Sequence, residues 1–133
     1  MTVLSTETLP VVSESDIVNV RRSVRESAAR LGFSLVDQTK VVTAASELAR
    51  NTLIHGKGGQ MELITLNGPR TGLRLSFQDR GPGIADIQLA LRDGFTTGSG
   101  LGLGLGGAKR LVNEFEINSR VGEGTTITVT RWK

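Results

Sequence analysis

The most restrictive feature of this sequence is a glycine-rich stretch in its second half. Seven of the 17 glycines in the 133 residues fall between positions 94 and 107. A packed core has little use for residues without side chains, whereas a backbone that must approach a ligand closely needs them. A flexible linker is the alternative interpretation, but the leucines interleaved with these glycines favour a loop that packs. The stretch therefore predicts a ligand-binding loop.

The remaining composition is that of a small globular protein. A chain of 133 residues with 38% hydrophobic residues can bury a core of its own. We therefore expect residues 1–133 to form a single domain. Cysteine is absent, which excludes disulfides and thiolate metal sites and fits a reducing cytoplasm.

The termini and the charge balance narrow the class of ligand. The chain has no signal-peptide start and no apolar run of the roughly 18 residues that a membrane helix needs, so we expect no membrane partner. A net charge of +3 suits a polyanion, and both a nucleotide and a nucleic acid qualify. Aromatic residues are only 4%, so surfaces for base stacking are scarce and we expect no nucleic-acid partner.

Periodic patterns predict alternating strands and helices. Residues 7–14 read as an edge strand, because Pro10 cannot donate a hydrogen bond to a central ladder. A helix capped by Ser15 or Asp16 follows and stops at Gly32, and a second helix runs from near Ser34 to Gly56. Further strands are expected at 60–66, 73–79, 116–120 and 125–132, and short helices at 84–92 and 107–113. This order predicts an α+β two-layer sandwich.

The second predicted helix carries a polar stripe. Glu47, Asn51 and His55 are spaced at i, i+4 and i+8, so they share one helix face. Such a stripe is commonly just a solvated face. Its functional interpretation is a carboxylate that takes a proton and a carboxamide oxygen that binds Mg²⁺. His55 is read as a helix-end histidine that is either hydrogen-bonded or exposed.

Two further segments carry weaker signals. Asp79 ends an apolar strand and is followed by Gly81 and Gly83, which suits either a turn or a carboxylate that accepts a hydrogen bond from a ligand amine. Residues 122–125, Gly-Glu-Gly-Thr, read by themselves as a hairpin turn. The glycine-rich stretch follows no strand and matches no phosphate-binding loop of the G-x-x-x-x-G-K-[ST] kind, so a dinucleotide-binding interpretation is not favoured.

Taken together and in this order, the four segments resemble the motifs of the Bergerat (GHKL) ATP-binding fold. That fold is shared by gyrase, Hsp90, histidine kinases and MutL. Glu47 and Asn51 match its N box, and Asp79, Gly81 and Gly83 match its G1 box. The glycines around 100–104 match its G2 box, and Gly122, Gly124 and Thr125 match its terminal G-T box. The resemblance implies a mostly antiparallel mixed sheet covered by helices on one face.

The whole chain is similar to the RsbT family, the switch-protein kinases of the bacterial stressosome. The matching stretches are VDQTKVVTAASELARN (36–51), DRGPGI (79–84), DGFTTG (93–98), GLGLGL (100–105), KRLVNEF (109–115) and GEGT (122–125). This resemblance implies an ATP-dependent serine/threonine kinase in the cytoplasm. Its substrates would be STAS-domain proteins of the RsbS and RsbR type, and after release it would activate an RsbU-type PP2C phosphatase.

The resemblance also implies a role for each motif residue. Asn51 would hold Mg²⁺, Glu47 would orient or deprotonate the acceptor hydroxyl, and Asp79 would accept a hydrogen bond from the adenine amino group. Gly81, Gly83 and Thr125 would border the same edge of the ring. The phosphates would be bound by residues of the glycine-rich loop, namely Gly98, Gly100, Leu101, Gly102, Leu103 and Gly104. Arg50 and Lys109 are read either as phosphate or partner contacts or as solvated charges.

Three other functions compete with this one. The catalytic half of a histidine kinase would need a phosphoacceptor histidine on a dimerising helix pair, and His55 lies inside the ATP-site pattern instead. An anti-sigma factor of the RsbW or SpoIIAB type shares the fold and also phosphorylates a STAS protein. A binding module that only senses the nucleotide would not need the carboxylate of Glu47.

Overall fold

The structure is a computed structural model that describes residues 1–91 and 104–133. These residues form a five-stranded sheet with the strand order β1-β2-β3-β5-β4. Every pairing in it is antiparallel. The strands are β1 (Thr2–Val11), β2 (Gly59–Asn67), β3 (Gly72–Asp79), β4 (Glu114–Arg120) and β5 (Gly124–Trp132).

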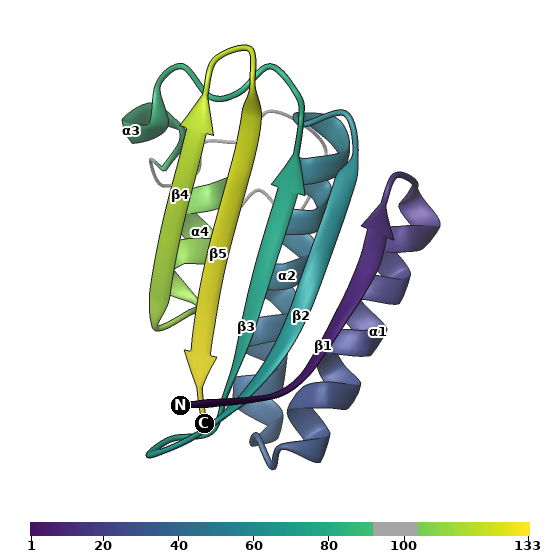
Figure 1. Cartoon of the computed structure of the whole chain (residues 1–133), viewed down its shortest axis with the longest axis vertical. Coiled ribbons are helices and arrows are strands. Elements are labelled where there is room, and N and C mark those ends of the chain that lie inside the picture. The colour runs from purple at the N-terminus through teal and green to yellow at the C-terminus, as the bar shows by residue number, and fades with distance from the viewer. Residues whose placement is uncertain (92–103) are drawn as a thin grey trace.

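The helices lie on one side of this sheet. They are α1 (Glu14–Arg30), α2 (Leu35–Ile54), α3 (Ile87–Ala90) and α4 (Gly104–Arg110). Figure 1 shows α1, α2 and α4 behind the sheet, with α2 behind its centre and α3 beside the upper end of β4. The predicted α+β two-layer sandwich is therefore confirmed. In the described residues the sheet is antiparallel throughout, so the expectation of a mixed sheet was wrong in that detail.

Serine side chains set the starts of the two long helices. The hydroxyl of Ser13 accepts a hydrogen bond from the Asp16 N–H at 3.3 Å, and that of Ser34 accepts one from the Asp37 N–H at 3.1 Å. Each bond satisfies a backbone donor that has no partner within the helix. The cap of α1 is therefore Ser13, and the predicted caps Ser15 and Asp16 were wrong. Asp16 lies in the first turn instead, where its carboxylate accepts the Val12 N–H at 2.9 Å.

The centre of the core is the packing of α2 against β2 and β3. Residues of α2 at positions 41, 44, 45, 48, 49 and 52 are buried, as are Met61 and Leu63 of β2 and Leu75 and Phe77 of β3. In each strand these residues alternate with more exposed ones, as expected when one face of a sheet packs on helices. Full burial of a side chain such as Leu48 stabilises the fold by about 1.5–3 kcal/mol.

Several elements differ from the prediction in their bounds, among them α3, which spans Ile87–Ala90 rather than residues 84–92, and β4, which begins at Glu114 rather than at residue 116. β1 starts at Thr2 rather than at residue 7, because Thr2 and Val3 pair with Asn67 and Leu66 at the end of β2. It is an edge strand, as predicted. The helix expected at residues 107–113 is α4, which spans Gly104–Arg110 and so ends three residues earlier.

The early end of α4 has a tertiary cause. The Asn113 N–H donates to the Thr130 carbonyl at 2.9 Å, and the Asn113 side chain accepts the Trp132 N–H at 2.7 Å. Both bonds draw the chain toward β5 and away from a helical path. The backbone therefore enters β4 at Glu114 instead of completing another helical turn.

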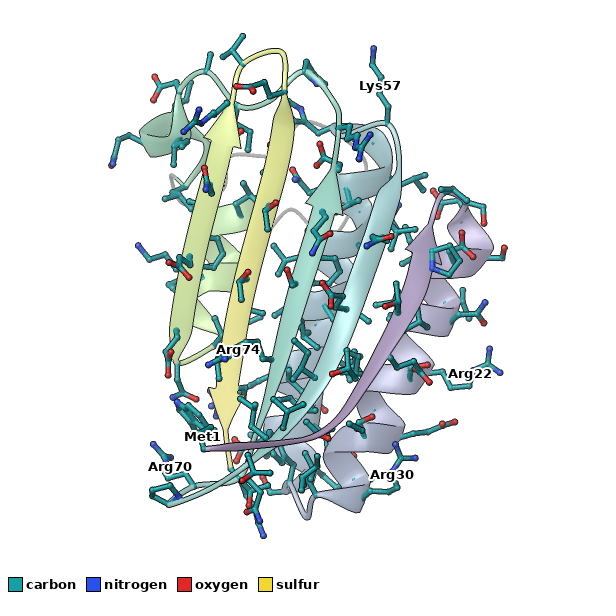
Figure 2. All side chains as sticks on the ribbon, viewed as in Figure 1. Met1, Arg22, Arg30, Lys57, Arg70 and Arg74 are labelled. Carbon is teal, nitrogen blue, oxygen red and sulfur yellow. The ribbon has the colours of Figure 1, made fainter. Side chains whose placement is uncertain are left out.

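The face of the sheet opposite the helices is polar. Gln78 donates to Glu62 at 2.8 Å, and Arg74 donates through Nε to the Thr130 hydroxyl at 3.0 Å. Figure 2 labels Arg74 on this open face. At the lower end of this face the ring of Trp132 lies against Gly72. A Cβ atom on Gly72 would be 2.5 Å from that ring. Cross-strand polar pairs of this kind suit a sheet face that meets water.

An ion pair ties the last strand to the start of α2. Arg131 of β5 donates through Nη2 to Asp37 Oδ1 at 2.7 Å and through Nη1 to the Leu111 carbonyl at 3.3 Å. The hydrogen bond from Arg131 is the largest cause that lowers the pKa of Asp37 below its ordinary value of 3.8. Burial opposes this shift, while the charges of Arg131 and Lys40 and a bond with Ser34 reinforce it.

This lowered pKa predicts a stability difference that depends on pH. The ionised carboxylate stabilises the folded state at pH values above about 4, and that contribution disappears as the pH falls through the lowered folded pKa. Asp37→Asn is therefore expected to be less stable than the parent chain at pH 7 and equally stable near pH 2. Urea denaturation at several pH values measures the difference. A gap that persists unchanged to the lowest pH would contradict the ion-pair explanation.

Candidate functional site

The polar stripe predicted on one helix lies on the second half of α2. Glu47 is buried, with 8% of its surface exposed, and Asn51 is half-buried. The Asn51 carbonyl accepts hydrogen bonds from the His55 N–H at 2.9 Å and the Gly56 N–H at 3.0 Å, which closes the end of the helix. Its side-chain carboxamide makes no hydrogen bond to any residue that the structure describes. A carboxamide with no partner in this part of the chain can bind a ligand.

The His55 side chain was expected to be either hydrogen-bonded or exposed, and among the described residues its Nε2 atom is neither. Its Nε2 atom is buried and has no hydrogen-bond partner within residues 1–91 and 104–133. A buried polar atom without a partner costs free energy, so such atoms commonly mark a site completed by water, an ion or a ligand. Because His55 follows Asn51 by four residues, the two side chains lie on the same face of the helix end.

The end of β3 meets the end of α2 at Asp79. Asp79 Oδ1 accepts the Gly81 N–H at 2.9 Å, whereas Oδ2 has no hydrogen-bond partner in the described part of the chain. Gly56 lies directly against this carboxylate, since a Cβ atom on Gly56 would be 2.3 Å from Asp79 Cγ and Oδ2. One oxygen is thus held by the loop, and the other remains able to accept a hydrogen bond from a ligand.

Close backbone packing explains the glycines around Asp79. A Cβ atom on Gly81 would lie 2.7 Å from the Gly56 backbone, and one on Gly83 would lie 2.3 Å from the Arg120 carbonyl oxygen. Gly124 has φ +116°, and a Cβ atom there would be 2.2 Å from the Asp79 carbonyl oxygen. The protein's own packing therefore requires glycine at all three positions, whether or not an adenine ring approaches them.

A row of polar side chains crosses three strands beside Asp79. Thr125 of β5 lies opposite Asp79 of β3 and also opposite Ser119 of β4. Thr125 is 3% exposed, and its hydroxyl lies 2.7 Å from that of Ser119. Ser119 Oγ also accepts the Ile84 N–H at 2.7 Å, which holds the loop that follows Asp79. Sequence reasoning missed Ser119, because a serine in an alternating strand carries no signal that separates it from a solvated residue.

The predicted phosphate-binding residues are only partly described. Gly98, Gly100, Leu101, Gly102 and Leu103 lie outside the described residues. Gly104 is the first residue of α4 and has φ +61°, in the left-handed region that favours glycine. The role assigned to these residues therefore stays a prediction.

Two basic residues, Arg50 and Lys109, were read either as phosphate or partner contacts or as solvated charges, and their surroundings differ. Arg50 pairs with Glu14 at the start of α1, with Nη1 and Oε1 3.4 Å apart. Lys109 is exposed on the last turn of α4. Arg50 is thus a contact between two helices in this structure.

Two negative findings concern the described residues alone. They contain no group of three or more His, Cys, Asp or Glu side chains placed to hold a metal ion. Among them, no helix has the length and apolar character needed to cross a membrane.

The Ser119 contacts predict a specific loss of stability. Ser119→Ala leaves the Ile84 N–H and the Thr125 hydroxyl without their partner, so the free energy of unfolding is expected to fall by about 1–3 kcal/mol. Chemical denaturation of the two proteins measures this change. Asn118→Ala, at the adjacent exposed position, is the control and should be nearly neutral. Equal losses in both variants would show that the hydroxyl contacts contribute nothing particular.

Comparisons with known proteins agree with this geometry. Residues 36–133 match the family described as histidine kinase-, DNA gyrase B-, and HSP90-like ATPase. The chain is 46% identical to the serine/threonine-protein kinase RsbT of Bacillus subtilis, and the similarity covers 92% of each chain. It is 30% identical to the anti-sigma F factor of a Thermoanaerobacter species, over 84% of this chain and 82% of that protein.

A solved structure shows the same arrangement of elements. The crystal structure of the RsbU and RsbW domains of a Mycobacterium tuberculosis protein covers 96% of this chain, with a TM-score of 0.66 and 26% identity. This chain spans 32% of that longer chain. The matched motifs, the α+β fold and the sequence identities lead to one conclusion: the chain belongs to the histidine kinase-, DNA gyrase B- and HSP90-like ATPase family, on the branch of the serine/threonine-protein kinase RsbT.

Proposed function

We propose that this chain is a cytoplasmic ATP-dependent kinase that phosphorylates a serine or threonine of STAS-domain proteins of the RsbS and RsbR type. After release from them it activates an RsbU-type phosphatase. The observation that carries the proposal is the arrangement at the end of α2. A buried carboxylate, Glu47, lies one helical turn before Asn51, whose carboxamide has no hydrogen-bond partner among the described residues, and the helix ends against Asp79.

Polar atoms that lack a partner within residues 1–91 and 104–133 support binding of ATP and Mg²⁺. Asp79 Oδ2 can accept a hydrogen bond from an amino group such as that of adenine, with Thr125 beside it. The Asn51 oxygen is a neutral hard ligand of the kind that Mg²⁺ binds together with phosphate oxygens. His55 Nε2 supplies a further polar atom that lacks a partner in the described residues. When bound, ATP with Mg²⁺ would supply the phosphoryl group and neutralise part of its charge.

The chain's own residues position the acceptor and move its proton. Glu47 takes the proton of the acceptor hydroxyl, a role that requires a carboxylate within hydrogen-bond reach of that hydroxyl. Asn51, one turn further along α2, would hold the ion through its side-chain oxygen, and it lies on the same helix face as this carboxylate. Phosphoryl transfer depends mainly on such positioning and charge neutralisation.

The anti-sigma factor is the second candidate function. The 30% identity to an anti-sigma F factor supports it, but the 46% identity to a kinase of the RsbT type favours the first proposal. The two candidates differ in an additional partner, because only an anti-sigma factor binds a sigma factor. Capture of a sigma factor by the purified chain would favour the second candidate.

The first test of the kinase proposal is Glu47→Gln. Loss of the proton acceptor is expected to slow phosphate transfer to a STAS-domain protein by at least about a hundredfold. ATP binding should remain within about threefold of the parent value, because Gln has nearly the shape of Glu and the assigned nucleotide contacts are made by other residues. Transfer is measured with γ-labelled ATP, and binding with a fluorescent ATP analogue.

Glu26→Gln is the matched control, since it removes one carboxylate from an exposed position on α1. It should leave transfer unchanged. If Glu47→Gln transfers phosphate at the parent rate, Glu47 is not the base. If the parent chain itself binds ATP and labels no STAS protein, the kinase proposal fails.

The second test concerns Mg²⁺. In the parent chain Mg²⁺ is expected to strengthen ATP binding, and Asn51→Ala should remove most of that effect because it deletes the proposed oxygen ligand. Titration of ATP with and without Mg²⁺ measures the difference in each protein. Asn118→Ala, on the open face of the sheet, should respond to Mg²⁺ as the parent does. A full Mg²⁺ response in Asn51→Ala would refute the assigned ligand.

A further inference from the structure

The hydroxyl of Ser119 on β4 lies where three segments of the chain meet. It accepts the Ile84 N–H at 2.7 Å, and it lies 2.7 Å from the Thr125 hydroxyl and 3.3 Å from the Gly124 carbonyl oxygen. These neighbours belong to the loop between β3 and α3 and to β5. The proposed transfer of phosphate gives Ser119 no role, so its place beside the nucleotide residues needs its own explanation.

The single proton of the Ser119 hydroxyl has two acceptors within reach. A serine hydroxyl carries one proton and two lone pairs, and the Ile84 N–H takes one lone pair. In one arrangement Ser119 donates to the Gly124 carbonyl, and Thr125 donates to Ser119. In the other Ser119 donates to Thr125, whose own proton is then left for an acceptor atom of a ligand. The second arrangement loses only the 3.3 Å contact, which is longer than the roughly 2.5–3.0 Å of a usual O–H···O bond.

Asp79 supplies a complementary group directly beside Thr125. The two residues are paired on neighbouring strands, so their Cβ atoms lie about 4.5–5.5 Å apart. Asp79 Oδ2 has no hydrogen-bond partner among the described residues, so the row presents an acceptor next to a donor. The edge of adenine has the matching order, because its amino group donates and the adjacent ring nitrogen N1 accepts. Guanine has the opposite order and would place its carbonyl oxygen against the carboxylate.

We propose that Ser119 is a positioning residue for recognition of the adenine base, which rests on the proposed function because it takes ATP as the bound nucleotide. Ser119 gives its proton to Thr125, and Thr125 donates its own to N1, directly or through one bound water. Asp79 Oδ2 accepts from the amino group. Thr125 is 3% exposed, so its bond is shielded from bulk water, which strengthens it.

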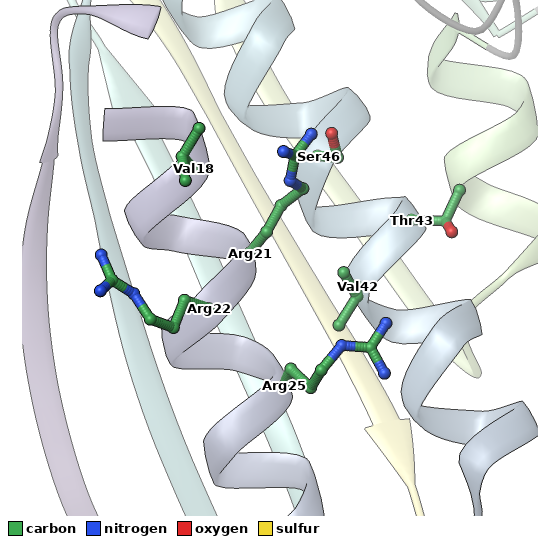
Figure 3. Close-up of a pocket in the computed structure, with 7 residues that line it drawn as sticks. All are labelled: Val18, Arg21, Arg22, Arg25, Val42, Thr43 and Ser46. Carbon is green, nitrogen blue, oxygen red and sulfur yellow. The ribbon is translucent and has the colours of Figure 1, made fainter. Parts of the chain in front are cut away.

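A pocket between α1 and α2 is the competing place for an anionic nucleotide. It has a volume of about 470 Å³, and Figure 3 shows Arg21 and Arg25 extending over it from α1 toward α2. Among the described residues its lining includes no carboxylate that would accept the amino group of adenine. It also shares no residue with the row that contains Ser119. A nucleotide held there through its phosphates would bind without regard to N1 or to Ser119.

The test separates N1 from the rest of the nucleotide. The probes are ATP and 1-deaza-ATP, which keeps the amino group but has a carbon atom in place of N1. The parent chain is expected to bind ATP about fivefold more tightly than 1-deaza-ATP, and Ser119→Ala should bring this ratio to about one, the loss of one net hydrogen bond. Any effect of the variant on the loop that carries Ile84 is shared by both probes and cancels in the ratio. Displacement of a fluorescent ATP analogue measures all four dissociation constants.

Two further variants separate positioning from stability. Ser119→Thr keeps a hydroxyl at this position and should restore the ratio. Val129→Ala, at a buried position further along β5, should lower the stability of the fold and leave the ratio at the parent value. If circular dichroism shows that Ser119→Ala does not fold, Ser119→Cys replaces it and should lower the ratio in the same direction, because a thiol is a weaker donor.

Failure of the positioning role and failure of the proposed function give different results. A ratio that stays at the parent value in Ser119→Ala would overturn the positioning role and leave the kinase proposal untouched. So would a parent chain that binds the two probes equally, which is the result expected if ATP occupies the pocket between α1 and α2. If the ratio depends on Ser119 but no phosphate reaches a STAS-domain protein, the positioning role stands and the kinase proposal fails. A parent chain that binds neither probe would overturn both.

Discussion

The close contact between the end of α2 and the end of β3 holds the candidate site together. Gly56 has no side chain, so the helix terminus can lie directly on the Asp79 carboxylate. Gly81 in turn packs on Gly56 and binds Asp79 through its N–H. Any side chain at Gly56 or Gly81 would push these elements apart, because interiors are close-packed and the clashing atoms are backbone or a bound carboxylate.

The helix α2 connects the features of the molecule that bear on function. Its first turn is tied to β5 by Asp37 and Arg131, its buried face rests on the centre of the sheet, and its last turn meets Asp79. The stripe with Glu47 and Asn51 lies on one of its remaining faces. Because one helix carries Glu47 and Asn51, the relative position of these two residues is fixed by the helix geometry.

Sequence reasoning was strongest where a residue acts through its nearest neighbours. The start of the second helix near Ser34, the edge position of the Pro10 strand and the spacing of Glu47, Asn51 and His55 all follow from local geometry. It failed where a distant segment decides the outcome. β1 begins at Thr2 because β2 is available to pair with it, and α4 ends early because Asn113 bonds to β5. The hydrogen bonds of Ser119 depend on residues that are remote in sequence. So does the burial of His55 Nε2 without a partner among the described residues.

The sequence by itself determined the order of helices and strands, the α+β class and the family, because periodicity and motif spacing are properties of the chain read in order. Only the tertiary structure decided that Asp79 Oδ2 has no hydrogen-bond partner among the described residues, and that Gly83 is required by the Arg120 backbone. The physical reason is that burial, pairing and uncompensated charge depend on which groups meet in space, and those groups lie on segments far apart in the sequence.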